Sequence, residues 1–210
     1  MKKVLAVLAA MAVAVLALAG CGGSDDKKAA TETKVLKVGA TAVPHAEILE
    51  QIKDDLKAEG IDLQVVEFND YVQPNLALND KELDANYFQH APYLENFVKE
   101  HPEVKLANAA GIHIEPMGIY SHKVKSLNEV KDGATVAIPN DPTNGGRALI
   151  LLSKAGLITL KDNNDIAATV NDITANPKNL KFQELEAAQV PRSIDDVDLL
   201  STAISLCRYL

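Results

Sequence analysis

The residues best suited to holding a small molecule are aromatic and lie close together in the sequence. Five of the nine aromatic residues fall between Phe68 and Tyr93, and His90 stands among them. Each ring taken alone is better explained by core packing. The cluster as a whole precedes a proline at the end of a predicted strand, and it fits the wall of a ligand pocket equally well.

Arginine is scarce, with three residues against eighteen lysines, and Arg147 follows Asn144-Gly145-Gly146 at the predicted start of a helix. A guanidinium there can hold a carboxylate through two hydrogen bonds, and a helix N-terminus adds positive potential. The glycine pair allows a ligand to approach the backbone closely. A solvated arginine on an amphipathic helix fits the local sequence just as well. The pair is not a phosphate-binding loop, because no Gly-Lys-Ser/Thr follows.

The sequence lacks the groupings that catalysis or metal binding requires. No serine stands in a Gly-x-Ser-x-Gly motif, Cys207 has no plausible histidine partner, and the five histidines form no close ligand pair. His45 opens a predicted helix, where it is expected to act as a cap, and His101 precedes a proline at a helix end. We therefore expect a binding protein rather than an enzyme, with no cofactor and no metal site.

Strands and helices alternate along the chain. Apolar runs predict strands over 35–40, 63–68, 83–88 and 135–139, and apolar residues near a 3.6 period predict helices over 45–59, 71–80, 92–101 and 147–155. Extended or short elements are expected over 105–120, 127–132, 166–174, 180–185 and 194–197. This order predicts two α/β lobes with mainly parallel sheets around a ligand cleft, lobe 1 over 34–120 and lobe 2 over 121–198.

The N-terminus has the pattern of an export signal. Two lysines precede the apolar run Val4–Ala19, which is short for a membrane span of about 20 residues. The run ends in Leu-Ala-Gly before Cys21, as in a bacterial lipobox. This predicts a signal peptide over 1–20, an acylated Cys21 and a lipid-anchored linker over 21–33. The alternative is an ordinary cleaved signal followed by an incidental cysteine.

The charge of the remaining chain excludes one class of partner. Residues 21–210 hold 19 Lys and Arg against 29 Asp and Glu, a net charge of −10. A surface this acidic disfavours contact with phosphate backbones, so no nucleic-acid partner is expected. Outside the cytoplasm ATP and NADH are also scarce, which further disfavours cofactor-dependent chemistry.

Several blocks of the body together resemble one protein family. They are FNDYVQPN (68–75), DANYFQHAPYL (84–94), EPMGIYS (115–121), VAIPNDPTNGGRAL (136–149), NPKNL (176–180) and ELEAAQVPRS (184–193). In this order they are similar to the methionine-binding lipoproteins, also called NlpA-type lipoproteins, which are the substrate-binding subunits of methionine ABC importers. The resemblance extends over 34–198.

The resemblance implies a periplasmic-binding-protein-like fold that closes on L-methionine. It implies that Arg147 pairs with the ligand carboxylate, that Tyr71, Phe88, His90 and Tyr93 wall the thioether pocket, and that Asn144 makes a polar contact. It further implies ABC permease and ATPase partners, and a place on the extracytoplasmic face of the cell membrane, where acylated Cys21 enters the lipid. The alternatives are another small amino acid or a methionine-containing dipeptide as ligand, or a surface lipoprotein such as an adhesin or antigen.

The resemblance stops near the C-terminus. After Asp198 the residues 199–210 depart from the family's usual continuation. We interpret this anomalous tail as the result of a frameshift or as a natural short variant. Either origin predicts that the family's final return segment is missing.

Overall fold

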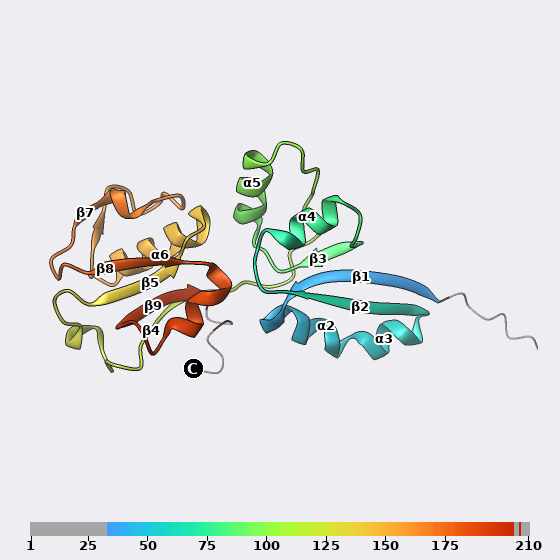
Figure 1. Cartoon of the computed structure of the whole chain (residues 1–210), viewed down its shortest axis with the longest axis horizontal. Coiled ribbons are helices and arrows are strands. Elements are labelled where there is room, and N and C mark those ends of the chain that lie inside the picture. The colour runs from blue at the N-terminus through green and yellow to red at the C-terminus, as the bar shows by residue number, and fades with distance from the viewer. Residues whose placement is uncertain (1–32, 204–205, 207–210) are drawn as a thin grey trace, which may run out of the picture. The chain divides into compact units, whose positions relative to one another are not determined.

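The computed structural model describes residues 33–203 and 206 (Figure 1). The predicted signal peptide, Cys21, the linker up to residue 32, and tail residues 204–205 and 207–210 lie outside the described residues. Within the described ranges, no helix is both long and apolar enough to cross a membrane.

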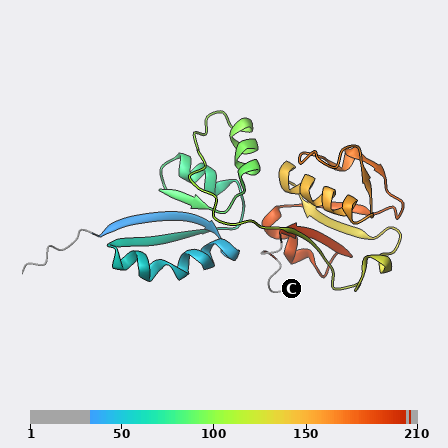
Figure 2. The same ribbon diagram turned by 180° about the vertical axis from the view of Figure 1, so that it is seen from behind.

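The first sheet is built from three parallel strands. They are β1 (Lys34–Thr41), β2 (Ile61–Phe68) and β3 (Ala85–Tyr87), in the order β2-β1-β3. The helices α2 (Glu47–Gln51) and α3 (Lys53–Ala58) run along one side of β1 and β2, whereas α4 (Gln73–Asn79) lies on the other side (Figures 1 and 2). A further helix, α5 (Ala91–Glu100), follows β3.

The helix predicted over 45–59 is interrupted. A π-helical turn, η1 (Ala42–Ala46), precedes it, and Ile52 separates α2 from α3 with φ −100° and ψ 0°. The backbone N–H of Ile52 bonds to the carbonyl of Leu49, three residues back, at 3.2 Å. This tighter turn breaks the regular spacing of hydrogen bonds that a continuous α-helix needs.

The second sheet is also mainly parallel. It contains β4 (Met117–Tyr120), β5 (Thr135–Pro139), β8 (Lys181–Leu185) and β9 (Leu199–Ala203), in the order β4-β9-β5-β8. Only the β4–β9 pair is antiparallel among the pairings in this sheet. An antiparallel pair that the sequence did not predict is formed by β6 (Thr159–Leu160) and β7 (Ile173–Ala175). The prediction of an α/β fold with mainly parallel sheets is confirmed.

The second sheet is covered on both faces. Helix α6 (Pro142–Lys154) packs over one face, and the 3-10 helix η4 (Ala187–Ser193) packs over the other. Side chains alternate between the two, as a strand requires. Val136 and Ile138 join the α6 core, whereas Ala137 between them joins Val190 of η4. Two short 3-10 helices complete the described elements, η2 (Leu127–Glu129) and η3 (Val170–Asp172).

The first residues of the predicted anomalous tail form a central strand. Leu199 packs into the α6 core and Leu200 into the η4 core, and each is at most 1% exposed. Asp198 fixes the start of β9 against β5, because its carboxylate accepts from the N–H of Thr135 at 2.8 Å and its own N–H donates to Thr135 at 3.0 Å. The lobe boundaries stay predictions, and so does the interpretation of the tail.

Candidate functional site

The helix that carries Arg147 begins five residues earlier than its predicted start. Asp141 is the N-cap, and its carboxylate accepts from the N–H of Asn144 at 2.9 Å and from the hydroxyl of Thr143 at 3.1 Å. Pro142 fills the first helical position, where no N–H is needed. The sequence-based start was wrong because it followed the apolar-rich run that begins at Arg147, and the helix continues through the two glycines before it. Arg147 therefore lies in the second turn of α6 and not at its N-terminus.

The glycine pair serves helix packing. A Cβ at Gly145 would lie 2.8 Å from the carbonyl oxygen of Pro139 at the end of β5. A Cβ at Gly146 would overlap the carbonyl of Ile166 and stand 3.1 Å from the backbone nitrogen of Ala168. The interpretation that these glycines open the backbone to a ligand is thus wrong. They let α6 lie directly against neighbouring backbone.

Gly146→Ala should therefore destabilise the protein. The new methyl group meets backbone that cannot rotate away, and overpacking of this kind costs about 1–3 kcal/mol. Urea unfolding measures the loss. Gly111→Ala is the matched control, since a Cβ there meets nothing within 4 Å, and it should change stability by less than about 0.5 kcal/mol. Equal effects for the two variants would contradict this account of the helix.

Arg147 is held by two neutral oxygens. Its Nη1 donates to Oδ1 of Asn144 at 3.1 Å, and its Nη2 donates to the backbone carbonyl of Glu115 at 2.7 Å. The amide of Asn144 is itself fixed, because its Nδ2 donates to both carboxylate oxygens of Asp141 at 3.1 Å. Burial lowers the pKa of Arg147, while Glu115 and Asp141 oppose that shift. The guanidinium is thus positioned without being neutralised by its direct partners.

Four predicted pocket residues form one ring cluster. The ring centroid of Tyr71 lies 5.7 Å from Phe88 and 5.9 Å from Tyr93, and His90 lies 6.4 Å from Tyr93. The Tyr71–Tyr93 contact is edge-to-face, a favourable geometry for aromatic pairs. The hydroxyl of Tyr93 also donates to the backbone carbonyl of Tyr71 at 3.1 Å. The structure therefore brings together rings that are 22 residues apart in sequence.

A buried amide network holds the segment that carries Phe88 and His90. Asn75 on α4 is 0% exposed, and it exchanges hydrogen bonds with Gln89 at 2.7 and 2.9 Å. Its Oδ1 also accepts from Nδ2 of Asn86 at 3.2 Å. These amides tie the end of β3 to α4. Sequence reasoning did not single them out, because their hydrogen-bond partners lie 11–14 residues away in the sequence.

The site keeps its histidine neutral and its tyrosines protonated. Burial and the nearby Arg147 lower the pKa of His90 to about 4, although Asp141 and Glu115 act in the opposite direction. Burial raises the pKa of Tyr71 well above its usual range, with further contributions from Glu115 and Asp141. Among the described residues, the buried Nε2 of His90 has no hydrogen-bond partner. A polar ligand atom could satisfy it.

A cavity of about 210 Å³ adjoins the cluster. It is lined by Tyr71, Val72, Tyr93, Asn96, Phe97, Glu100, His101, Asn140, Asp141, Pro142, Glu186 and Ala187. Tyr71 and Tyr93 are thus the predicted pocket residues that line it, and the N-cap Asp141 joins them. The other four predicted residues stand outside this lining, although the charge of Arg147 lowers the pKa of both Tyr71 and His90. His101, which directly follows α5, also lines the cavity.

Comparison with known proteins places the chain in one family. The sequence profile described as NlpA lipoprotein matches residues 36–205. The D-methionine-binding lipoprotein MetQ of Escherichia coli K12 is 46% identical over 190 residues, which are 90% of this chain and 68% of that protein.

Solved structures give the same result. A nutrient binding protein from Burkholderia cenocepacia bound to methionine matches with a TM-score of 0.75 and 46% identity, over 81% of this chain and 72% of that one. A structure of the methionine binding protein MetQ matches with a TM-score of 0.78 and 45% identity, over 82% and 71% of the two chains. The chain therefore belongs to the NlpA lipoprotein family.

Proposed function

We propose that this protein captures free methionine outside the cytoplasm and delivers it to an ABC importer. The observation that carries the proposal is the fixed guanidinium of Arg147 near a cluster of aromatic rings. A free amino acid with a long apolar side chain needs such a pair, a cation for its carboxylate and an apolar wall for its side chain. The relatives named for methionine binding and the methionine-bound structure support the same ligand.

In this proposal each predicted residue has a distinct role. Arg147 grips the ligand carboxylate, and Asn144 orients Arg147 while it offers a polar contact of its own. Tyr71, Phe88 and Tyr93 surround the thioether, because sulfur packs favourably against aromatic rings. The neutral His90 presents its Nε2 to the ligand. No step makes or breaks a covalent bond, so the protein acts by binding alone.

Delivery requires a membrane anchor and partner subunits. We propose that acylated Cys21 holds the protein at the extracytoplasmic face of the membrane and that the stretch after it, which has no bulky apolar residue, acts as a tether. The loaded protein then docks on a permease whose transport is driven by ATPase subunits. Membership of a lipoprotein family supports the anchor.

A ligand panel tests the chemistry of the pocket. Competition dialysis of the full chain should rank methionine first. Norleucine, which has a methylene in place of the sulfur, should bind roughly 2- to 10-fold more weakly, since sulfur–aromatic contacts contribute about 0.3–1.5 kcal/mol. Leucine, whose branched side chain has a different shape, should be weaker still. A preference for glycyl-methionine over methionine would instead establish a dipeptide-binding protein.

A further inference from the structure

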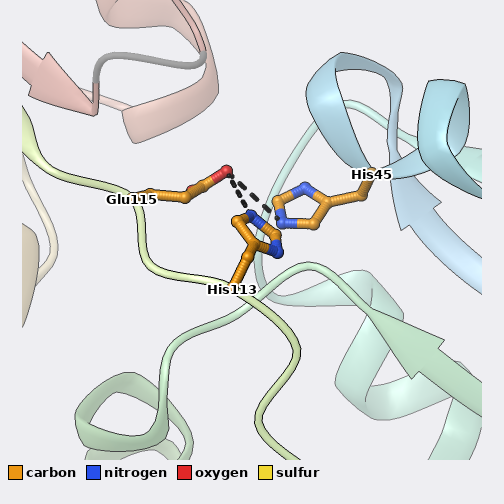
Figure 3. A group of neighbouring side chains, drawn as sticks. All are labelled: His45, His113 and Glu115. Atoms are coloured by element: carbon orange, nitrogen blue, oxygen red, sulfur yellow. Dashed lines mark hydrogen bonds and ion pairs between the residues drawn. The ribbon is translucent and has the colours of Figure 1, made fainter.

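A second cluster, made of polar side chains, contains the chemistry of a metal site. His45 comes from η1, at the end of β1, whereas His113 and Glu115 come from the segment that precedes β4. Figure 3 shows both imidazoles turned toward the same carboxylate oxygen of Glu115. Ile114, which stands between His113 and Glu115 in sequence, is 89% exposed. The side chains of His113 and Glu115 thus face each other, while the apolar side chain between them in sequence remains in solvent.

The distances fit three ligands around one ion. Nε2 of His113 lies 3.1 Å from Oε1 of Glu115, and Nε2 of His45 lies 3.6 Å from the same oxygen. One ligand atom from each residue lies within 4.8 Å of the other two. Ligands on a tetrahedral Zn²⁺ with bonds of about 2.0–2.1 Å stand roughly 3.3 Å apart, so a small adjustment would seat the ion. The 3.6 Å separation is, by contrast, too long for a hydrogen bond.

The second nitrogen of each imidazole is already oriented. Nδ1 of His45 lies 2.6 Å from the hydroxyl of Thr41, and Nδ1 of His113 lies 2.7 Å from the hydroxyl of Tyr87. Histidines that bind metals usually donate their other ring N–H to an oxygen, which fixes the ring and its tautomer. When both hydroxyls accept in this way, two Nε2 lone pairs and a carboxylate converge, and all three can bind a cation placed between them.

The burial of the cluster suits a bound ion that can exchange. His45 is 4% exposed, whereas the side chains of Glu115 and His113 are 22% and 30% exposed. The first ligand is thus rigidly held, and the open side leaves room for a water molecule as the fourth ligand. Two imidazoles and one carboxylate form a set that Zn²⁺ and neighbouring divalent ions favour over Mg²⁺ or Ca²⁺.

We propose that His45, His113 and Glu115 bind a divalent first-row transition metal ion, with Zn²⁺ as the best fit. This departs from the sequence-based expectation of no metal site. The ion would clasp the segment before β4 to the end of β1. It would also bear on Arg147, because the backbone carbonyl of Glu115 accepts the hydrogen bond from Nη2 of that residue. Metal binding itself does not depend on the identity of the organic ligand.

Calorimetric titration of the tag-free full chain with Zn²⁺, after removal of metal by a chelator, tests the proposal. We expect one ion per chain and a rise in melting temperature on loading. Glu115→Gln and His113→Gln should each weaken binding at least about 100-fold. Thr41→Val, which removes only the hydroxyl beside His45, should weaken it roughly 10- to 100-fold. His122→Gln is the control, because His122 pairs with Asp195 at 2.8 Å outside the cluster.

Melting curves in chelator establish that each variant is folded before binding is compared. If Glu115→Gln does not fold, the zinc affinities of Thr41→Val and His113→Gln still test the proposal. The proposal is overturned if the wild-type chain takes up no ion, or if binding survives unchanged in the folded cluster variants. In either case the group is a hydrogen-bonded clasp, in which the hydroxyls of Thr41 and Tyr87 donate to Nδ1 and protons on both Nε2 face Glu115.

Discussion

Arg147→Ala should weaken methionine binding by about 2–5 kcal/mol, or roughly 30- to 5,000-fold, because a partly buried carboxylate loses its cationic partner. In the free protein Arg147 is held by neutral oxygens of Asn144 and Glu115, so its charge remains available to a ligand. Calorimetry with methionine measures the change. Arg147→Lys should recover only part of the affinity, since an ammonium cannot form the paired hydrogen bonds of a guanidinium.

Arg192→Ala is the matched control for that experiment. Arg192 lies in η4 and is exposed, so its removal should leave the affinity within a factor of about two. A melting curve checks that Arg147→Ala is folded, because the variant also loses two internal hydrogen bonds. A change in affinity of a few tenths of a kcal/mol for folded Arg147→Ala would remove this residue from the site.

The second large effect is a loss of stability in mild acid. Burial lowers the pKa of both His45 and His90 from an ordinary 6.5 to about 4. Between pH 6.5 and pH 4 the unfolded chain binds protons that the folded chain does not, so the free energy of unfolding falls as the pH falls. Each histidine contributes a slope of up to about 1.4 kcal/mol per pH unit, and up to about 3 kcal/mol over the whole window.

Urea unfolding of the metal-free protein, at several pH values from 7.5 to 4.5, measures this slope. The stability contribution of the neutral histidines is fully present above pH 6.5 and is lost as the pH approaches 4. His90→Gln should reduce the slope by about 1.4 kcal/mol per pH unit, because it removes one of the two groups. An unchanged slope in this variant would show that His90 does not take up its proton on unfolding.

Local sequence patterns predicted most of the regular elements. The apolar runs of β1, β2 and β5 fall where the strands were expected, and so do the periodic helices α4 and α5. The start of α6 was misplaced, because the apolar-rich run begins at Arg147 whereas Asp141 and Pro142 together cap an earlier start. The strand β9 was not expected. Its burial comes from pairing with β4 and β5, which are distant in sequence.

Two sequence features predicted residues of the candidate site: the scarcity of a residue type, and the clustering of such residues within a short segment. Tyr71, Phe88, His90 and Tyr93 stood out because rings are few in this chain and these lie within a short segment. Arg147 stood out because arginine is scarce. The groups that position them could not be found in this way. The hydrogen bond from Arg147 to Glu115 spans 32 residues of sequence. The cluster of His45, His113 and Glu115 likewise joins residues that are far apart in the sequence.

The most direct test of the central claim is a calorimetric titration of the unaltered chain with L-methionine, repeated with D-methionine. The account predicts saturable binding of one methionine per chain by at least one enantiomer, and the bound ligand should raise the melting temperature. A folded chain that shows neither binding heat nor thermal stabilisation with either enantiomer would contradict the proposal that this protein captures methionine.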